Sequence, residues 1–442
     1  MGTRGPRSIS RRGAAKLMAG ALAASVAAPG LGWAQAASAG SRNDFPLSPE
    51  EEFFLGEMQR AACLYFYEQA DPVTGQVLDR AANRNPSGAL DPRRITSIAA
   101  TGFGLTALCI ADKRNYLPFV DIRERVVRTL DFHLNKMEHQ HGFFSHYNEV
   151  KTGRAFAFSE VSSIDTCILL CGVLTCREYF DDPKIKEMAT QLYHRVEWPW
   201  MLNGGLTFSM GWRPDSAFIA TRWDHYCELM MLYLLAIGSP THGVDPSFWK
   251  NFSRPRIDYG PYVYIGDSDP LFVHQYSHAW FDFQGKRDAY ADYFRNSVLA
   301  TQAHKLFCLS LNRGYSDDLW GITASDWEHG YTAWGGPPLI GPVNGSVVPC
   351  AAAGSLPFLP EECLRVLLSM RQSFGERAWG RYGFCDCFHP ELEWYDPDVL
   401  GIDLGIGLLM AENLRSGFVW KTFMQNPEAL AAMQRVGFHD VT

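Results

Sequence analysis

Five segments of helical length in this chain are apolar on every side, and charged residues stand at or before the start of each. The charged residues and the apolar segments that follow them are Arg94 before 98–110, Glu160 and Asp165 before 167–174, Asp224 and Glu228 before 229–237, Asp326 ahead of 347–356, and Asp403 directly before 404–410. A helix without a polar face must be buried on all sides. Its polar end then faces a pocket, so several such helices opening at one rim would gather carboxylates and aromatic rings in one cleft.

Helices with a single apolar face are predicted between the apolar segments. They cover 120–137, 184–196 and 361–370, and a further buried segment begins near His274. The order of buried helix, exposed helix, buried helix predicts an all-α ring of helical hairpins with an inner and an outer layer. An irregular helical globule is the alternative. No linker rich in Ser, Gly or Pro follows residue 45, so we expect a single domain over 37–442.

The N-terminal segment 1–36 has the features of an export signal. It contains Arg11-Arg12, then Lys16, then an apolar stretch, then the small residues around Gln35. This order is typical of a twin-arginine signal peptide, which predicts a periplasmic or secreted protein. A disordered basic N-terminus is the alternative.

Charge and cysteine usage restrict the partners. The net charge is −8, and segment 1–36 carries five basic residues and no acidic one, so the mature chain would carry about −13. Nucleic acid and anionic membranes are therefore unfavourable partners, and a neutral ligand bound by a monomer is expected. The 11 cysteines lie mostly in apolar segments and are predicted to be buried thiols. Cys385-Asp386-Cys387 lacks a second pair of zinc ligands.

Asp224 and Glu228 form the sharpest local signal for catalysis. Because they are four residues apart, they would share one face of a helix and repel each other. In a dry site one of their two pKa values would rise, which suits a general acid. Alternatively, Asp224 caps the helix while Glu228 pairs with Arg222.

Glu160 and Asp165 form the second candidate pair. On a continuous helix they would point about 140° apart, so they would not act as one dyad. One of them can face the cleft while the other holds a neighbouring residue. The alternative is that this segment, with Ser159 or Ser162, only caps the following helix.

Histidine and aromatic residues suggest sugar binding. His274 and His278 are four residues apart, but no further ligand follows at a usual spacing, so hydrogen bonding or packing is favoured over a metal. The candidate sugar platforms, each of which can instead be a core residue, are Trp212, Trp223, Trp327, Tyr331 and Trp394.

No glycine-rich phosphate loop opens a helix, and no Gly-x-Ser-x-Gly elbow is present. Cleavage of a glycosidic bond needs two carboxyl groups and no cofactor or metal. Glycoside hydrolysis is therefore the chemistry that best matches the residues present.

Several segments resemble the glucoamylase-like domain of bacterial endo-β-1,2-glucanases, glycoside hydrolase family 144. They are 97–104, 163–166, 226–228, 236–242, 274–278 with Asp282, 324–326, 355–358, 401–405 and 412–420. The resemblance runs in order from about residue 50 to the C-terminus. It implies an (α/α)6 toroid with long loops that form a cleft at one rim, and inverting hydrolysis of β-1,2-glucan. Related domains include exo-acting and transglycosylating members.

The resemblance places Asp165, Glu228, Asp326 and Asp403 on family-like positions. We expect Glu228 to be the general acid, and Asp165 or Glu160 to activate water or hold the sugar. Asp326 and Asp403 are alternative bases that would otherwise bind substrate. The remaining predicted substrate-binding residues are Arg94, Trp212, Trp223, Asp224, Tyr226, His278, His329 and Tyr331.

Two other classes remain open at this stage. A polysaccharide lyase can use a similar toroid, but it binds an acidic substrate, which the negative charge disfavours. A glycan-binding protein without catalysis would need aromatic platforms but no pair of carboxyl groups. Inversion predicts catalytic carboxyls about 6.5–9.5 Å apart, whereas about 5 Å favours retention.

Overall fold

The structure is a computed structural model, and it describes residues 45–267, 270–338 and 341–441. The predicted signal segment 1–36 lies outside the described residues.

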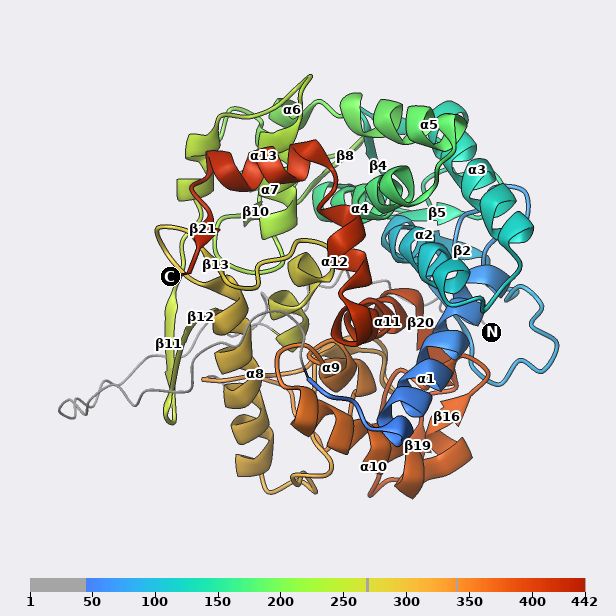
Figure 1. The fold of residues 1–442 in the computed structure, drawn as a ribbon, viewed down its shortest axis with the longest axis vertical. Coiled ribbons are helices and arrows are strands. Elements are labelled where there is room, and N and C mark those ends of the chain that lie inside the picture. Colours follow the sequence, from blue (N-terminus) through green and yellow to red (C-terminus); the bar gives the residue numbers. More distant parts are fainter. Residues whose placement is uncertain (1–44, 268–269, 339–340, 442) are drawn as a thin grey trace.

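The inner layer is built from the apolar segments. Its helices are α2 (Ile98–Lys113), α4 (Ser163–Tyr179), α7 (Met230–Gly238), the 3-10 turns η3 (Leu271–His274) and η4 (Tyr276–Ala279), α9 (Pro349–Ala353) and α11 (Gly401–Ser416). All nine residues of α7 are buried, as are the first fourteen of α2. Figure 1 shows α2, α4, α9 and α11 nearer the centre than the helices at the periphery.

The outer layer is built from helices with one apolar face. They are α1 (Pro49–Glu68), α3 (Phe119–Asn135), α5 (Pro183–His194), α8 (Tyr293–Ser310), α10 (Pro360–Ala378) and α13 (Pro427–Arg435). Three short helices lie in the connections: α6 (Trp198–Leu202), η2 (Pro246–Lys250) and α12 (Phe418–Phe423). Figure 1 shows α3, α5, α10 and α8 around the edge of the molecule. The predicted all-α (α/α)6 toroid is confirmed.

Two inner segments are shorter than the sequence indicates. The apolar run 347–356 yields only the five-residue α9, because Gly354 ends it and Pro357 and Pro360 follow closely. The segment near His274 forms two 3-10 turns instead of an α-helix.

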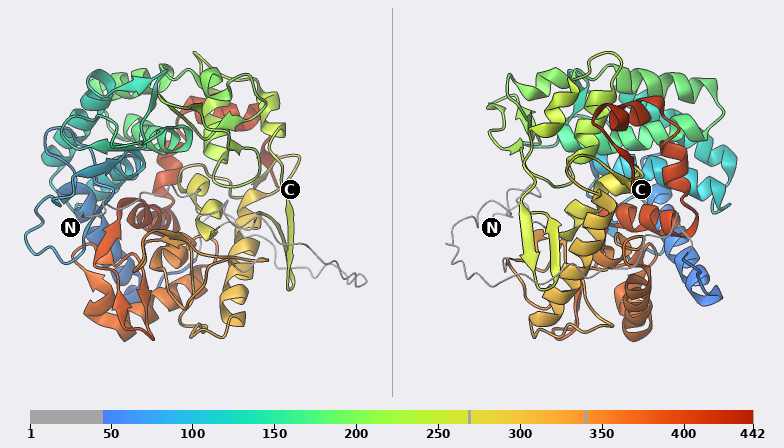
Figure 2. Two further views of the ribbon diagram at one scale, coloured as in Figure 1. Left: turned by 180° about the vertical axis from the view of Figure 1, so that it is seen from behind. Right: turned by 60° about the vertical axis from the view of Figure 1, so that its left-hand side comes forward.

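The strands are short and lie in the connections. They are β1 (Arg80–Ala82), β2 (Ile95–Ser97), β3 (His139–Gln140), β4 (Phe143–Phe144), β5 (Tyr147–Glu149), β6 (Val161–Ser162), β7 (Phe208–Ser209), β8 (Gly211–Arg213), β9 (Ala217–Phe218), β10 (Arg222–Trp223), β11 (Arg256–Tyr259), β12 (Tyr262–Ile265), β13 (Lys286–Arg287), β14 (Ala324–Ser325), β15 (Thr332–Ala333), β16 (Trp379–Gly380), β17 (Gly383–Phe384), β18 (Phe388–His389), β19 (Trp394–Tyr395), β20 (Asp398–Leu400) and β21 (His439–Asp440). The hairpin β11–β12 packs along α8, with Ile257 and Tyr264 against Ala300 and Ala303 (Figure 2).

Close approach of α2 to α4 fixes the inner wall. A Cβ on Gly172 would lie 2.0 Å from the carbonyl oxygen of Gly102, and a Cβ on Gly102 would lie 2.3 Å from that of Ile168. Only glycine permits this backbone contact. The 11 cysteines are buried thiols, as predicted.

Among the residues that the structure describes, every helix is too short or too polar to cross a lipid bilayer.

Candidate active site

Antiparallel strand pairs bring the starts of the inner helices together. β2 leads directly into α2 and pairs with β5, so that Ile95 faces Glu149. β6 leads into α4 and pairs with β8, and β20 leads into α11 and pairs with β1. These strand pairs therefore place the starts of α2, α4 and α11 beside neighbouring loops.

The first polar cluster is formed by His146, Glu160 and Asp165. The Nδ1 atom of His146 lies 3.4 Å from Oε1 of Glu160 and 3.6 Å from Oδ2 of Asp165. Asp165 lies in the first turn of α4, where the Oγ–H of Ser162 donates a 2.6 Å hydrogen bond to Oδ2. Ser162 also caps the helix by accepting the N–H of Asp165. The predicted cap and the predicted polar site thus coincide.

Opposite charges dominate this cluster. Burial raises the pKa of Glu160, but the hydrogen bond and charge of His146 outweigh burial and lower it to about 2. Burial lowers the pKa of His146, while the charges of Asp165 and Glu160 raise it above its ordinary value. Glu160 is therefore an ionised carboxylate beside an imidazolium, which suits holding a sugar or a water molecule more than donating a proton.

Asp79 and Arg80 connect this cluster to a second one. The charge of Asp79 acts on both His146 and Asp326. The Nε–H of Arg80 donates a 2.9 Å hydrogen bond to Asp79, and its Nη1 group pairs with Asp326. One continuous line of charged side chains thus joins the start of α4 to the loop after β14.

The second cluster contains Asp326, Asp386, Asp396 and Asp403, all more than nine-tenths buried. The N–H of Asp326 donates a 2.8 Å hydrogen bond to Oδ2 of Asp386. Asp403 lies in the first turn of α11, and its charge acts on Asp386. Four carboxyl groups from four separate stretches of sequence therefore meet.

Burial and mutual repulsion favour protonation in this second cluster. Burial raises the pKa of Asp326 to about 6, because Arg80 is shared with Asp79 and only partly opposes the effect. Burial also raises the pKa of Asp396 to about 7, against the hydrogen bond from the N–H of Asp398. For Asp386, burial and then the charge of Asp403 raise the pKa well above its ordinary value. The rim thus holds acids that are ionised and acids that keep a proton near neutral pH.

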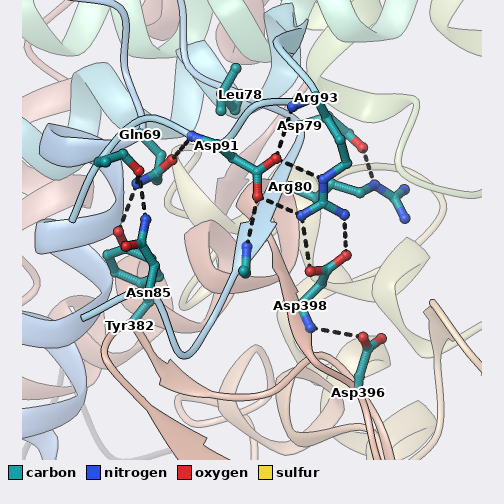
Figure 3. Close-up of polar contacts among 12 residues, drawn as sticks. Gln69, Leu78, Asp79, Arg80, Asn85, Asp91, Arg93, Tyr382, Asp396 and Asp398 are labelled. Atoms are coloured by element: carbon teal, nitrogen blue, oxygen red, sulfur yellow. Dashed lines mark hydrogen bonds and ion pairs between the residues drawn. The ribbon is translucent and has the colours of Figure 1, made fainter. Parts of the chain in front are cut away.

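A frame of ion pairs supports the second cluster (Figure 3). Arg93 donates through Nε to Asp91 at 2.8 Å and through Nη2 to Asp398 at 2.9 Å. The N–H of Asp398 then donates to Oδ1 of Asp396 at 2.9 Å. This chain of contacts fixes the loop between β19 and β20, and with it the position of Asp396.

An open groove adjoins Asp396. It has a volume of about 570 Å³ and is lined by Arg84, Arg377, Glu393, Trp394, Tyr395, Asp396 and Pro397. The Trp394 ring lies 5.5 Å from that of Trp327, which follows Asp326 directly and lies 5.9 Å from Trp334. The groove thus combines polar groups with aromatic surfaces, which is the composition expected of a sugar-binding site.

Glu228 lies in the turn ahead of α7 and is 5% exposed. Its main-chain carbonyl accepts a 2.8 Å hydrogen bond from Ser277. The Nε1–H of Trp223 donates to Oγ of Ser163 at 2.8 Å, so the segment before Glu228 packs on the start of α4. The chain just before Glu228 therefore lies beside the start of α4, which carries Asp165.

The prediction that Asp224 and Glu228 share one helical face is wrong. The segment 224–226 pairs with Ser253 instead, whose N–H donates to the Asp224 carbonyl at 2.8 Å. Asp224 is exposed, with Oδ1 2.9 Å from Nδ1 of His225. Arg222 donates to the carbonyls of Leu202 and Thr207 rather than to Glu228.

Three predicted binding residues are buried in the core. Trp223 and Tyr226 are at most 2% exposed, and the Tyr226 ring stacks 5.8 Å from that of Tyr293. His278 lies 4.8 Å from the Phe283 ring, and burial lowers its pKa to about 3. It is a neutral core residue, and its Nε2 atom lies 3.1 Å from Oγ of Ser297.

The other predicted binding residues lie near the surface. Trp212 is half-buried in β8, and Tyr331 is half-buried next to β15. His329 is exposed, 5.4 Å from the Trp327 ring. Arg94 is exposed, with its carbonyl accepting the N–H of Val150. The arginine that reaches the acidic cluster is Arg80, not Arg94.

Sequence reasoning missed His146, Asp79, Arg80 and Asp396 as site residues. Their contacts join loops that carry no helical or strand periodicity, so no local spacing indicates them.

Among the described residues, no group of three or more His, Cys, Asp or Glu side chains has the arrangement of a metal site.

Comparison of the sequence with protein families adds to the evidence from the fold. A family model described as "Putative glucoamylase" matches residues 220–427, within a chain that folds as an (α/α)6 toroid.

Individual relatives are more specific. A solved endo-β-1,2-glucanase from Chitinophaga pinensis, in complex with sophorotriose and glucose, is 27% identical, with a TM-score of 0.81 over 89% of this chain and 99% of that chain. The exo β-1,2-glucooligosaccharide sophorohydrolase of Parabacteroides distasonis is 26% identical over 441 residues, 90% of this chain. The chain spans 59% of that relative's length. An endo-β-1,2-glucanase from Talaromyces funiculosus, at 10% identity and a TM-score of 0.60 over 87% of this chain and 92% of that chain, shares the fold.

Proposed function

We propose that this chain is a glycoside hydrolase that cleaves β-1,2-glucan by inversion with two carboxyl groups. The observation that carries the proposal is the coexistence at one rim of an ionised acid and protonated acids. The pKa of Glu160 is lowered to about 2, while the pKa of Asp396 is raised to about 7 and that of Asp386 well above its ordinary value. Hydrolysis of a glycosidic bond needs both kinds of carboxyl group. The proposed specificity for the β-1,2 linkage is based on similar proteins that act on β-1,2-linked glucans.

In this proposal Glu228 is the general acid. Its buried position ahead of the apolar helix α7 keeps water away from the proton that it delivers to the leaving oxygen. Asp165 or Glu160, held by His146, positions the water or the sugar at the cleavage point. Asp326 and Asp403 are the alternative bases on the other side of the rim.

The groove beside Asp396 would accept further glucose units. Trp394 offers an apolar surface for a sugar face, and the polar residues around it offer hydrogen bonds to hydroxyls. The carboxylates along the rim would repel an acidic polysaccharide, which argues for a hydrolase of neutral glucan over a lyase.

A substrate panel tests this function. Purified protein is incubated with β-1,2-, β-1,3-, β-1,4- and α-1,4-glucans, and reducing ends are measured. We expect turnover of β-1,2-glucan at least about tenfold above any other. Preference for another linkage, or no turnover of any glucan, would refute the proposal.

The Glu228→Gln variant tests the assignment of the acid. Because glutamine cannot donate the proton, we expect kcat to fall by about 10²–10⁴-fold with an unchanged melting temperature. The matched control is Glu57→Gln, at an exposed position of α1, which should leave kcat unchanged. Near-normal turnover by Glu228→Gln would remove Glu228 from this role.

We also propose that the chain is exported by the twin-arginine route and acts as a monomer. The support is the order of Arg11-Arg12, Lys16 and the apolar stretch. Cell fractionation should find the wild type outside the cytoplasm and an Arg11→Lys, Arg12→Lys variant inside it. Equal distribution of both would contradict the route, and a dimeric mass by light scattering would contradict the monomer.

A further inference from the structure

Asp386 is the most enclosed acid of the second cluster. It lies between β17 and β18, flanked by the buried thiols of Cys385 and Cys387, and is 5% exposed. Its N–H donates to the carbonyl of Asp398 at 3.1 Å. Its Oδ2 atom accepts the N–H of Asp326 at 2.8 Å. Main-chain contacts on both sides thus fix this carboxyl group.

The second oxygen of Asp386 lacks a donor. No N–H or O–H group among the described residues donates to Oδ1 of Asp386. A small cavity of about 40 Å³ has both Asp386 and Asp403 in its wall, beside apolar groups such as Ala62 and Gly407. Burial and then the charge of Asp403 raise the pKa of Asp386 well above its ordinary value. Two carboxyl groups enclosed beside one dry cavity repel each other when both are ionised, so the pair retains a proton.

We propose that Asp386 and Asp403 share one proton, and that Asp386 is the positioning residue that orients the carboxylate of Asp403 at the start of α11. The effect of this arrangement on turnover rests on the function proposed above. The shared proton itself does not depend on any substrate.

The surroundings assign the proton to Asp386. Asp403 lies at the N-terminal end of α11, where the unpaired N–H groups and the helix dipole favour an anion. Asp386 lies in a loop without such a dipole, and Oδ2 is already an acceptor, which leaves Oδ1 to carry the proton. The titratable and charged groups around Asp386 are Asp326, Asp396, Asp398, Asp403, Cys385, Cys387 and, through Asp326, Arg80.

Three variants separate a positioning role of the Asp386 carboxyl group from the effect of merely filling its space. In Asp386→Asn, the amide N–H can donate to Asp403 while the amide oxygen accepts the N–H of Asp326, so the geometry is kept without a titrating proton. In Asp386→Leu, the donor to Asp403 is lost. Asp318→Asn, at an exposed position, is the matched surface control.

The first readout is the pH profile of kcat on β-1,2-glucan. We expect Asp386→Asn to keep kcat within about tenfold of wild type, and Asp386→Leu to lose about 10²-fold or more because Asp403 is misplaced. The alkaline decline of the wild type, where the shared proton is lost, should be absent in Asp386→Asn. An Asp386→Asn variant as inactive as Asp386→Leu, or an unchanged alkaline decline, would overturn the positioning role.

The second readout needs no substrate. The infrared difference spectrum of wild type minus Asp386→Asn at pH 7 should contain the C=O band of a protonated carboxyl group, shifted in heavy water. Its absence would overturn the shared proton. If the band is present but wild type cleaves no β-1,2-glucan, the pair stands and the proposed function fails.

Discussion

At the scale of single residues, the site is defined by which carboxyl groups keep a proton. Glu160 lies beside a histidine, whereas Asp326, Asp386 and Asp396 crowd together with one shared arginine. The first arrangement favours the charged form of a carboxyl group, and the second favours the neutral form. The two halves of the rim should therefore respond oppositely to pH.

The contribution of Glu160 is testable through His146. The folded-state pKa of Glu160 is about 2 against an ordinary 4.5, so its contribution is present above about pH 4.5 and is lost as pH falls through 2. His146→Gln removes the partner, and we expect it to lower the free energy of unfolding by about 1–3 kcal/mol at pH 6. The loss should shrink at higher pH, where His146 is neutral.

Urea denaturation at several pH values measures this effect. His242→Gln, at an exposed position, is the control and should be neutral. A loss for His146→Gln that is the same at pH 6 and pH 9 would contradict the charge-based account.

Asp396 should behave in the opposite way. Its folded-state pKa of about 7 exceeds the ordinary 3.8, so its stabilising contribution is complete below about pH 4 and is lost as pH rises through 7. Asp396→Asn keeps the oxygen that accepts the N–H of Asp398 and cannot ionise. We expect it to stabilise the protein by roughly 1–3 kcal/mol at pH 8 and to be neutral at pH 4. Melting curves at both pH values measure this effect, with Asp318→Asn as the control. A variant that is stabilised at pH 4 but not at pH 8 would contradict the account.

At the scale of elements, the contact between α2 and α4 places Asp165. The glycines Gly102 and Gly172 let the two backbones touch, and the start of α4 is thereby fixed against the starts of its neighbours. The strand pairs that lead into α2, α4 and α11 fix the same rim from outside. Overpacking inside this wall should therefore damage both stability and activity.

Gly172→Ala tests the element scale. Its Cβ would meet the backbone of Gly102 at 2.0 Å, so the helices must separate, and we expect a loss of about 3 kcal/mol or more with reduced turnover. Gly56→Ala is the matched control, because its Cβ meets nothing closer than 3.9 Å and alanine favours the helix α1. Equal melting temperatures of the two variants would show that the contact does not constrain the wall.

At the scale of the whole molecule, the ring could be predicted from the sequence but the site only in part. The buried runs 98–110, 167–174 and 404–410 became α2, α4 and α11, because burial on all sides leaves few alternatives for such segments. Asp165 and Asp403 were found because they open these helices. Asp79, His146 and Asp396 were not, because their roles come from contacts between loops that carry no periodic pattern. The segment before α7 was misread because pairing with Ser253 overrode the helical spacing.

The groove beside Asp396 makes a prediction about chain length. Trp394→Ala removes its aromatic surface, and we expect KM for long β-1,2-glucans to rise about 3–10-fold with little change in kcat. Trp394→Phe should restore most of the affinity. The control Phe53→Ala removes an exposed aromatic ring of α1 that is 69% exposed and should have no effect. A matching fall in kcat with unchanged KM would place Trp394 outside the binding groove.

The central claim is that acids from distant stretches of sequence meet at this rim to break a glycosidic bond with inversion. Proton NMR of the first products from β-1,2-glucan tests it most directly, because the anomeric signal appears before mutarotation. The account predicts that the α-anomer of the new reducing end forms first. Initial formation of the β-anomer, or no product at all, would contradict it.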